Sequence, residues 1–174
     1  MIVKKLTKDD AEDYRQIRLE ALEKNADSFG TTYQEEVIKT TEQFRDKIPV
    51  DNNNFILGCF EDKHLIGIVA FNQESRIKLC HKAHISSMYV KQEYRRKGIG
   101  KLLLNKLIEK AKAINKVEIL LLDIVKSNFL AKQLYLSLGF QIYGTQKMAY
   151  KFNSQYFDLE FMYLQIKEQI LKYY

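Results

Sequence analysis

The feature that most constrains the fold is a strand, a basic glycine turn, a helix and a second strand that follow one another. His84–Val90 has a strand-like composition, and the turn Arg95–Gly100 reads RRKGIG. Apolar residues recur at helical spacing in Ile99–Ile114, which predicts a helix with one buried side. Val117–Ile124 is almost continuously apolar, as expected of a central strand paired in parallel and covered on both faces. Together these segments predict a right-handed βαβ unit.

The turn has the composition of a phosphate-binding loop. Main-chain N–H groups and the positive end of a helix stabilise a phosphate, and glycine lets the anion approach the backbone. Two common phosphate-binding patterns do not fit. A P-loop requires glycine where Arg95 stands and Ser or Thr where Leu102 stands, while the dinucleotide fingerprint requires a third glycine where Leu103 stands. The remaining pattern is R-x-x-G-x-G, with Gly98 and Gly100.

A second block of residues lies downstream of the turn. It reads Asn128-x-x-Ala131-x-x-Leu134-Tyr135-x-x-Leu138-Gly139-Phe140. The two blocks together resemble the GCN5-related N-acetyltransferase (GNAT) family, whose central motif is [QR]-x-x-G-x-[GA] and whose later helix carries N-x-x-A-x-x-L-Y-x-x-x-G-F. The resemblance covers roughly Ile66 to Lys151 and is looser at both ends of the chain.

The resemblance and the order of the elements predict the fold class. We expect an α/β fold with a mixed, mainly antiparallel central sheet flanked by helices and containing one parallel βαβ crossover. The chain has 174 residues, of which 46% are hydrophobic, which is enough for one core and too few for two ordinary domains. We therefore expect one N-acetyltransferase domain over residues 1–174, with the terminal Tyr173–Tyr174 disordered.

Periodicity, capping residues and turn residues predict the other elements. One helix is expected from the cap at Thr7–Asp10 to about Lys24. The other expected helices are Thr41–Ile48, which ends before Pro49, and Asn128–Leu138. The expected strands are Ile2–Leu6, Phe55–Glu61, Leu65–Asn72, His81–Val90, Val117–Ile124, Phe140–Phe152 and Leu159–Ile166, with a tight hairpin at Asp62–Lys63 and loops at Asn25–Thr32 and Pro49–Asn54.

Composition argues against several other classes of protein. The net charge is +6, but the lysines are scattered and no dense basic run with interleaved aromatics occurs, so we rank a nucleic-acid binder last. Cys59 and Cys80 have neither metal-ligand nor disulfide spacing, so we expect free thiols and no metal. No apolar run reaches the length of a membrane span, and we expect a soluble, cytoplasmic protein without membrane or nucleic-acid partners.

The resemblance implies acetyl-CoA as co-substrate and names the residues that hold it. The pyrophosphate is expected on main-chain N–H groups of the turn, with the Arg95 side chain bracing the turn. Val90 is expected to pair with the pantetheine arm through its backbone, and Asn128 either to bind that arm or to cap its helix. The full expected set is Met88, Tyr89, Val90, Arg95, Arg96, Lys97, Gly98, Ile99, Gly100, Lys101, Asn128, Ala131 and Tyr135.

Acetyl transfer from a thioester to an amine requires three kinds of group. An alkylamine has a pKa of about 10.4, so a base or a water chain must take its proton. A fixed donor must stabilise the carbonyl oxygen, and the resemblance implies the Met88 N–H for this role. An acid must protonate the leaving sulfur, and Tyr135 stands at the family's tyrosine position, although a packed core tyrosine is the structural alternative.

The base is the most open assignment. His84 lies eleven residues before Arg95, where the resemblance places a glutamate base in histone acetyltransferases, and an unperturbed histidine has a suitable pKa near 6.5. The alternatives are a half-buried sheet histidine without a catalytic role, a carboxylate such as Glu35 or Glu36, and a water relay. The fold of the family implies that the acceptor meets residues of Asn25–Glu36 and Tyr143–Tyr156.

We interpret the chain as an acetyl-CoA-dependent N-acetyltransferase. It is expected to act on a primary amine of a small molecule or peptide by direct attack in a ternary complex, because no cysteine lies near either motif. The alternative is a non-catalytic acyl-CoA-binding regulatory module. The sequence does not identify the amine. The late-strand aromatics Phe157, Phe161 and Tyr163 are expected to be exposed and are candidates for a homodimer contact.

Overall fold

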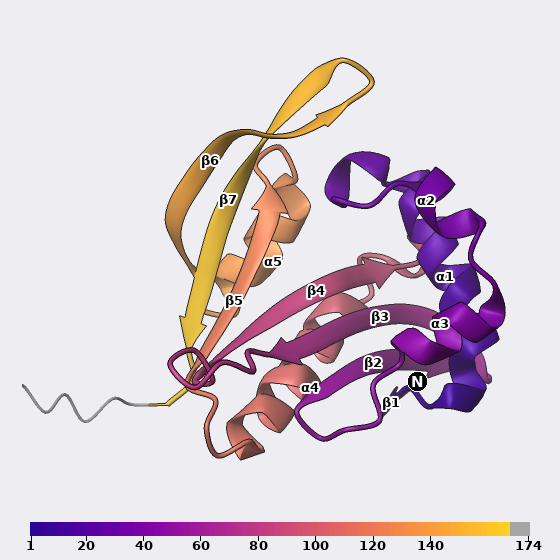
Figure 1. The fold of residues 1–174 in the computed structure, drawn as a ribbon, viewed down its shortest axis with the longest axis horizontal. Helices are drawn as coiled ribbons and strands as arrows, with labels where there is room; N and C mark the ends of the chain where they lie inside the picture. The colour runs from indigo at the N-terminus through magenta and orange to yellow at the C-terminus, as the bar shows by residue number, and fades with distance from the viewer. Residues whose placement is uncertain (168–174) are drawn as a thin grey trace, which may run out of the picture.

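A mixed β-sheet forms the centre of the molecule (Figure 1). The structure is a computed structural model, and it describes residues 1–167. Within these residues the sheet has seven strands in the order β1-β2-β3-β4-β5-β7-β6. The strands are β1 Ile2–Lys5, β2 Asn54–Glu61, β3 His64–Gln73, β4 Lys82–Val90, β5 Ile119–Val125, β6 Gln141–Phe152 and β7 Gln155–Gln165. Tyr173–Tyr174 lies outside the described residues.

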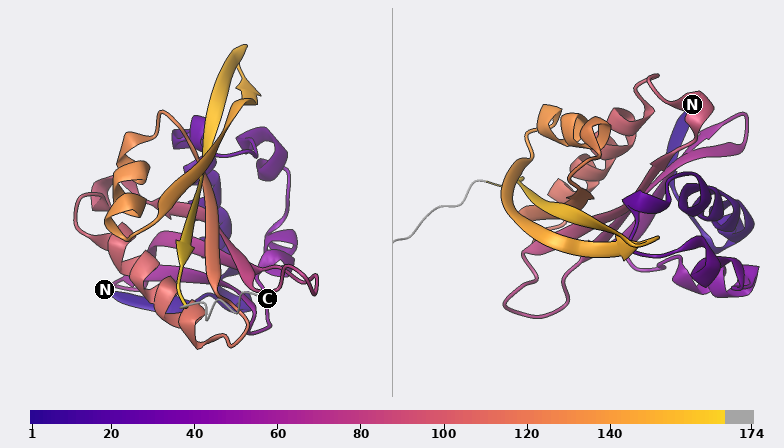
Figure 2. Two further views of the ribbon diagram at one scale, coloured as in Figure 1. Left: turned by 90° about the vertical axis from the view of Figure 1, so that its left-hand side faces the viewer. Right: turned by 90° about the horizontal axis from the view of Figure 1, so that it is seen from above.

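Helices cover both faces of the sheet (Figure 2). One face carries α4 and α5, and the other carries α1, α2 and α3. The helices are α1 Ala11–Lys24, α2 Tyr33–Val37, α3 Thr41–Lys47, α4 Ile99–Ala113 and α5 Phe129–Ser137, with short 3₁₀ turns η1 Lys8–Asp10, η2 Ala26–Ser28 and η3 Gln92–Tyr94.

Strand pairing confirms the predicted fold class. β4 and β5 run parallel with α4 between them in the chain, and the other neighbouring strands pair antiparallel. The prediction that the apolar run is covered on both faces is wrong. The strand begins at Ile119, and Leu120 and Leu122 are buried while Asp123 between its apolar neighbours is exposed. Helices α4 and α5 cover only the face that carries Leu120 and Leu122.

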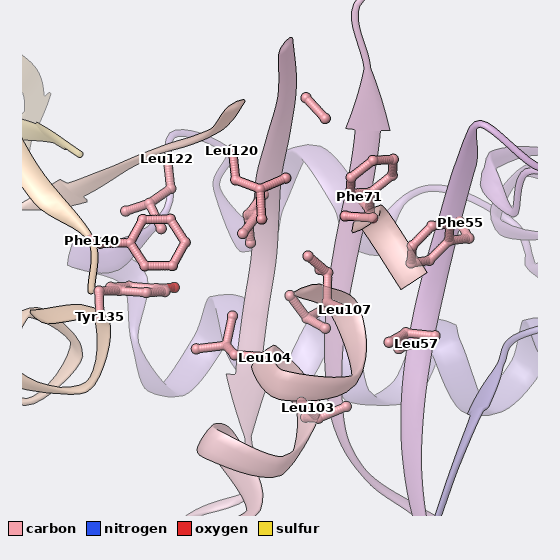
Figure 3. Packing of buried hydrophobic residues seen from close by; sticks show 14 of the residues in the cluster. Phe55, Leu57, Phe71, Leu103, Leu104, Leu107, Leu120, Leu122, Tyr135 and Phe140 are labelled. Atoms are coloured by element: carbon pink, nitrogen blue, oxygen red, sulfur yellow. The ribbon is translucent and has the colours of Figure 1, made fainter. Parts of the chain in front are cut away.

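Two apolar cores form because neighbouring residues of a strand point to opposite faces. On β2, Phe55 and Leu57 belong to the core under α4 and α5, whereas Ile56 belongs to the core under α1 and α3. Phe55 stacks on Phe71 of β3 at 4.7 Å between ring centroids, and Figure 3 shows this pair beside the leucines of α4. Each such fully buried side chain contributes about 1.5–3 kcal/mol, so the sheet forms a rigid support for its loops.

The helix that follows the glycine turn has the predicted buried side. Leu103, Leu104 and Leu107 are fully buried in the core of Figure 3, and Ile99 and Ala111 extend the same stripe by one turn at either end. The stripe fixes α4 against β2 and β3, so the helix begins at a defined place beside the end of β4.

Two parts of the prediction differ from the structure. The loop after Asn25 is followed by α2, whose Thr32–Glu35 capping box starts a helix of only five residues. Such a helix is too short for hydrophobic periodicity to reveal it. β7 begins at Gln155 rather than Leu159, because Asn153 and Ser154 both have positive φ and close a two-residue hairpin.

Among the helices of residues 1–167, none combines the length and the apolar character that crossing a membrane requires.

Candidate active site

The glycine turn presents a group of unused main-chain donors. Gly98 is the N-cap of α4 and has φ 78°, a left-handed conformation that disfavours other residues. The first bond to its carbonyl comes from the N–H of Leu102, at 3.0 Å. The N–H groups from Arg96 to Lys101 donate to no acceptor within residues 1–167. They lie at the positive end of a fifteen-residue helix, which is a favourable place for an anion.

Gly100 is required for a different reason. A Cβ at this position would stand 3.0 Å from Leu134 Cδ2 and 3.3 Å from Met88 Cε. The missing side chain therefore lets the start of α4 pack closely against both α5 and β4. No such contact limits Gly98, whose Cβ would have no atom within 4 Å, so the first glycine serves conformation and the second serves packing.

Arg95 holds the turn to the rest of the protein. Its Nε donates to the carbonyl of Val90 at 2.9 Å, its Nη2 donates to Asn25 Oδ1 at 2.7 Å, and its guanidinium lies over the Tyr89 ring. Arg95 is therefore engaged with neighbouring protein groups. Arg96, Lys97 and Lys101 are exposed at the same turn and supply its free positive charge.

The two parallel strands separate next to this turn. β4 and β5 pair only from Lys82 to His84, opposite 119–121, and then diverge (Figure 1). The register of β3 and β4 shifts between Ile68 and Ala70, and Ser87 has φ 54°, which marks a bulge in β4. Met88, Tyr89 and Val90 therefore lie where β4 has left β5, and the side chain of Tyr89 is buried toward α1, where it donates to Glu20 at 2.9 Å.

Tyr135 lies on α5 beside the separated strands. Its ring packs edge-to-face on Phe140, with centroids 5.6 Å apart, and Figure 3 shows its hydroxyl pointing away from α5 into the cluster. Burial raises the pKa of Tyr135, and the charge of Asp123 raises it further. The phenol therefore keeps its proton at neutral pH.

Asn128 caps α5, as one of its two predicted roles requires. Its Oδ1 accepts a hydrogen bond from the N–H of Ala131 at 3.1 Å. Its Nδ2 donates to the Ser28 hydroxyl at 3.4 Å. An amide nitrogen carries two hydrogens, so one further donor remains for a ligand.

A cavity of about 570 Å³ is lined by residues of α1, η2, α2 and the β6–β7 hairpin. This volume is typical of small-molecule sites. The cavity walls are mostly aromatic and aliphatic, with three charged residues among them. They consist of Leu22, Glu23, Ala26, Asp27, Phe29, Gly30, Thr32, Tyr33, Gln34, Ala149, Tyr150, Lys151, Phe152 and Phe157.

Comparison with known proteins identifies the family. The model of the acetyltransferase (GNAT) family matches residues 12–140. The chain belongs to this family. It is therefore an acyltransferase, with acetyl-CoA as its acetyl donor.

Solved structures share the fold of this GNAT acetyltransferase over nearly its whole length. A GNAT acetyltransferase from Streptococcus pneumoniae has a TM-score of 0.85 at 23% identity, over 95% of this chain and 99% of that one. The yncA protein of Salmonella typhimurium, solved with its cofactor acetyl-CoA, has a TM-score of 0.84 at 22% identity, over 97% and 95%. A ribosomal-protein-alanine N-acetyltransferase from Brucella melitensis has a TM-score of 0.79 at 24% identity, over 95% and 99%.

The turn of this acetyltransferase fits the diphosphate of acetyl-CoA. The unused N–H groups from Arg96 to Lys101 provide donors, and three exposed cations provide charge. Of the residues predicted to hold the cofactor, Ile99 has its side chain in the core and Ala131 supplies its N–H to Asn128, so both shape the site through packing and backbone.

Asp123 is a candidate site residue that the sequence analysis did not name. It is exposed on β5, and its Oδ2 accepts a hydrogen bond from the Tyr150 hydroxyl at 3.4 Å. Tyr150 lines the cavity and lies so close to Gly30 that a Cβ there would stand 3.1 Å from the hydroxyl. The run Val117–Ile124 holds two charged residues, Glu118 and Asp123, and the position of Asp123 between apolar neighbours was the available signal.

His84 lies where β4 and β5 begin to separate. Its ring is about half exposed, and Nε2 is 3.1 Å from Glu74 Oε1. On β4 it faces away from the core under α4 and α5, and on β5 Asp123 faces the same way, because the buried residues of both strands alternate with them. The two candidates thus share one face of the sheet.

The two glutamates of α2 already have partners. Glu35 Oε2 accepts from the N–H of Thr32 at 2.7 Å and from its hydroxyl at 2.8 Å, and these bonds lower its pKa. Glu36 is buried and pairs with Lys39 at 2.7 Å and with Lys47. Burial alone raises the pKa of Glu36, but the hydrogen bonds from the two lysines outweigh it and the pKa is lowered. Both carboxylates are therefore poor proton acceptors.

The late-strand aromatics differ from expectation. Phe157, Phe161 and Tyr163 are half-buried, not exposed. Tyr143 packs on both Phe161 and Tyr163 at 6.0 Å between centroids, and it is the ring left exposed. The β6–β7 pairing brings these rings together across the two strands.

Proposed function

We propose that the chain is one N-acetyltransferase domain that transfers an acetyl group from acetyl-CoA to a primary amine of a small molecule or peptide. The transfer is a direct attack in a ternary complex. One observation carries the proposal: the hydrogen bond from Tyr150 to Asp123 connects the cavity wall with the strand that borders the split in the sheet. A carboxylate thereby stands where an amine in the cavity and a thioester between β4 and β5 would meet.

The cofactor would be held mainly by backbone. The N–H groups of Arg96, Lys97, Gly98, Ile99, Gly100 and Lys101 bind the diphosphate, and the backbone of Met88–Val90 together with the second N–H of Asn128 Nδ2 binds the pantetheine arm. When bound, acetyl-CoA supplies a thioester-activated acetyl group. The protein orients that group and supplies the proton transfers.

Asp123 takes the proton of the amine in this proposal. An alkylammonium with a pKa of about 10.4 must lose its proton before it can act as a nucleophile. Asp123 is exposed on the face of β5 that points away from α4 and α5, and it is connected to the cavity by its hydrogen bond from Tyr150. His84 is the second candidate, because it faces the same way from β4, but its ring is already oriented by Glu74.

Met88 acts on the carbonyl oxygen of the thioester, and Tyr135 acts on its sulfur. The main-chain N–H of Met88, next to the bulge at Ser87, donates to the carbonyl oxygen. Tyr135 keeps its proton because burial raises its pKa, so the phenol can protonate the departing sulfur. Cys59 is fully buried, and burial raises the pKa of its thiol, which argues against an acyl-cysteine route.

A thiol-release assay with acetyl-CoA tests the proposal over polyamines, amino acids, aminoglycosides and peptide N-termini. We expect coenzyme A release with at least one class of amine. Tyr135→Phe should bind acetyl-CoA normally and release coenzyme A much more slowly. Normal acetyl-CoA binding by the wild-type protein, without release for any amine, would instead indicate a regulatory module that binds acyl-CoA.

A further inference from the structure

The turn η2 connects the two halves of the site. It follows α1, and Ala26, Asp27 and the next residue Phe29 line the cavity. In Figure 1, η2 lies beside the end of β5, and the two elements are in contact. The turn therefore stands between the proposed acceptor pocket and the split in the sheet.

Two side chains from the two cofactor motifs hold η2 at its ends. Arg95 Nη2 donates to Asn25 Oδ1 at 2.7 Å, just before the turn. Asn128 Nδ2 donates to the hydroxyl of Ser28 at 3.4 Å, on its last residue. Arg95 is also bonded to the end of β4, and Asn128 also caps α5. Each of these two hydrogen bonds thus connects a part of the cofactor cleft with the pocket wall.

The turn depends on these two hydrogen bonds because few interactions within η2 stabilise it. It has three residues, with internal bonds from Ser28 N to Asn25 O at 2.9 Å and from Phe29 N to Ala26 O at 3.4 Å. No residue of η2 is buried. A single 3₁₀ turn with poor hydrogen-bond geometry has little stability of its own.

We propose that Asn25 and Ser28 are positioning residues that couple occupancy of the cofactor cleft to the shape of the acceptor pocket. The inference rests on the proposed function, because it needs the cavity to be the acceptor site. Coenzyme A bound at the glycine turn and at Asn128 immobilises Arg95 and Asn128, and these two side chains then restrict η2. The amine meets a wall that is already ordered, so it binds more tightly when the cofactor is present.

Hydrogen exchange with coenzyme A alone tests the coupling without any amine. In the wild-type protein, coenzyme A should slow exchange of the amides of Ser28 and Phe29 by about fivefold or more. In Asn25→Ala/Ser28→Ala the slowing should disappear while the dissociation constant for coenzyme A changes by less than about fivefold, the equivalent of one hydrogen bond of about 1 kcal/mol, because neither residue is among those proposed to hold the cofactor. Thr41→Ala is the matched control, because it removes a hydrogen bond from α3 to Glu12 of α1 away from η2. Equal slowing in the double variant would overturn the inference.

Steady-state kinetics provide the second readout. With an amine found by the thiol-release assay, Asn25→Ala and Ser28→Ala should each raise the KM for the amine about fivefold and leave kcat nearly unchanged. Asn25→Asp and Ser28→Thr keep the accepting oxygens and should restore the KM. A fall in kcat, or no rescue by the conservative variants, would overturn the positioning role. If no amine reacts, the proposed function fails, whereas the exchange experiment still decides the coupling.

Discussion

The proposed cofactor side and the proposed acceptor side of this acetyltransferase are stabilised in different ways. The helix after the glycine turn is fixed by fully buried Leu103, Leu104 and Leu107. On the acceptor side, α2 is fixed by polar groups: Arg15 donates to the carbonyls of Val37 and Lys39, and Glu36 pairs with two lysines. Apolar burial stabilises the cofactor side, whereas hydrogen bonds and ion pairs stabilise the acceptor side.

The difference shows which part of the site is free to vary. In the proposed function the cofactor side binds with main-chain N–H groups, which any sequence supplies if the glycines and the apolar stripe are kept. The acceptor side presents side chains on short elements that local hydrogen bonds hold. A substitution there changes the pocket without unfolding the sheet, so the acceptor side is suited to determine which amine binds.

Replacing Asp123 gives the largest expected effect in a test that separates the acceptor side from the cofactor side. Asp123→Asn should lower kcat about 100-fold or more, because general base catalysis contributes roughly 10²–10⁴-fold. The affinity for acetyl-CoA, measured by calorimetry, should not change. His84→Gln is the matched comparison and should lower kcat by less than about threefold. A larger loss in His84→Gln than in Asp123→Asn would reverse the assignment of the base.

Replacing Glu36 tests how much its ion pairs stabilise α2. Glu36→Gln should lower the free energy of unfolding by about 1–3 kcal/mol at pH 7, measured with urea, because a hydrogen-bonded charge is lost. The pKa of Glu36 is lowered in the folded protein, so its stabilisation is present above the unfolded pKa of about 4.5 and is lost as the pH falls through the lower folded value. The difference between wild type and variant should therefore shrink below about pH 4.5. A difference that stays constant to pH 3 would contradict this account.

Replacing Gly98 tests the backbone character of the cofactor site. Gly98→Val should cost about 1–2 kcal/mol in stability, because a branched residue is strained at φ 78°. Its affinity for coenzyme A should fall about tenfold as the N–H groups are displaced. The control Gly144→Ala places its Cβ at an ordinary 3.7 Å from Phe161 and should leave both quantities unchanged. Unaltered affinity in Gly98→Val would show that the turn geometry is not needed for binding.

The smallest expected effect concerns the cap of α2. Thr32→Ala removes the hydroxyl that accepts from the N–H of Glu35 at 3.3 Å, and should lower stability by about 0.5–1 kcal/mol. Thermal unfolding measures the change, and Thr32→Ser, which keeps the hydroxyl, is the control. Because Thr32 lines the cavity, the amine KM should rise while coenzyme A affinity stays the same. A matching loss of coenzyme A affinity would mean that a change on the acceptor side also alters the cofactor side.

Sequence reasoning was most successful where residue spacing has a direct structural meaning. Gly98, Gly100 and the stripe of α4 have a period and a position that predict the turn and the helix, and both are found. It failed for α2, which is too short for any period. It gave no indication of the contact between Asp123 and Tyr150, because this contact joins residues twenty-seven positions apart.

The amino-acid sequence by itself determined the βαβ unit, the glycine turn and the family, because these depend on local conformation and on the spacing of apolar residues along one segment. Only the tertiary structure decided which residues meet across segments. The bonds from Arg95 to Asn25 and from Asn128 to Ser28 join positions 70 and 100 residues apart. No local pattern encodes such contacts, because they depend on how the sheet brings α1, β4 and α5 together.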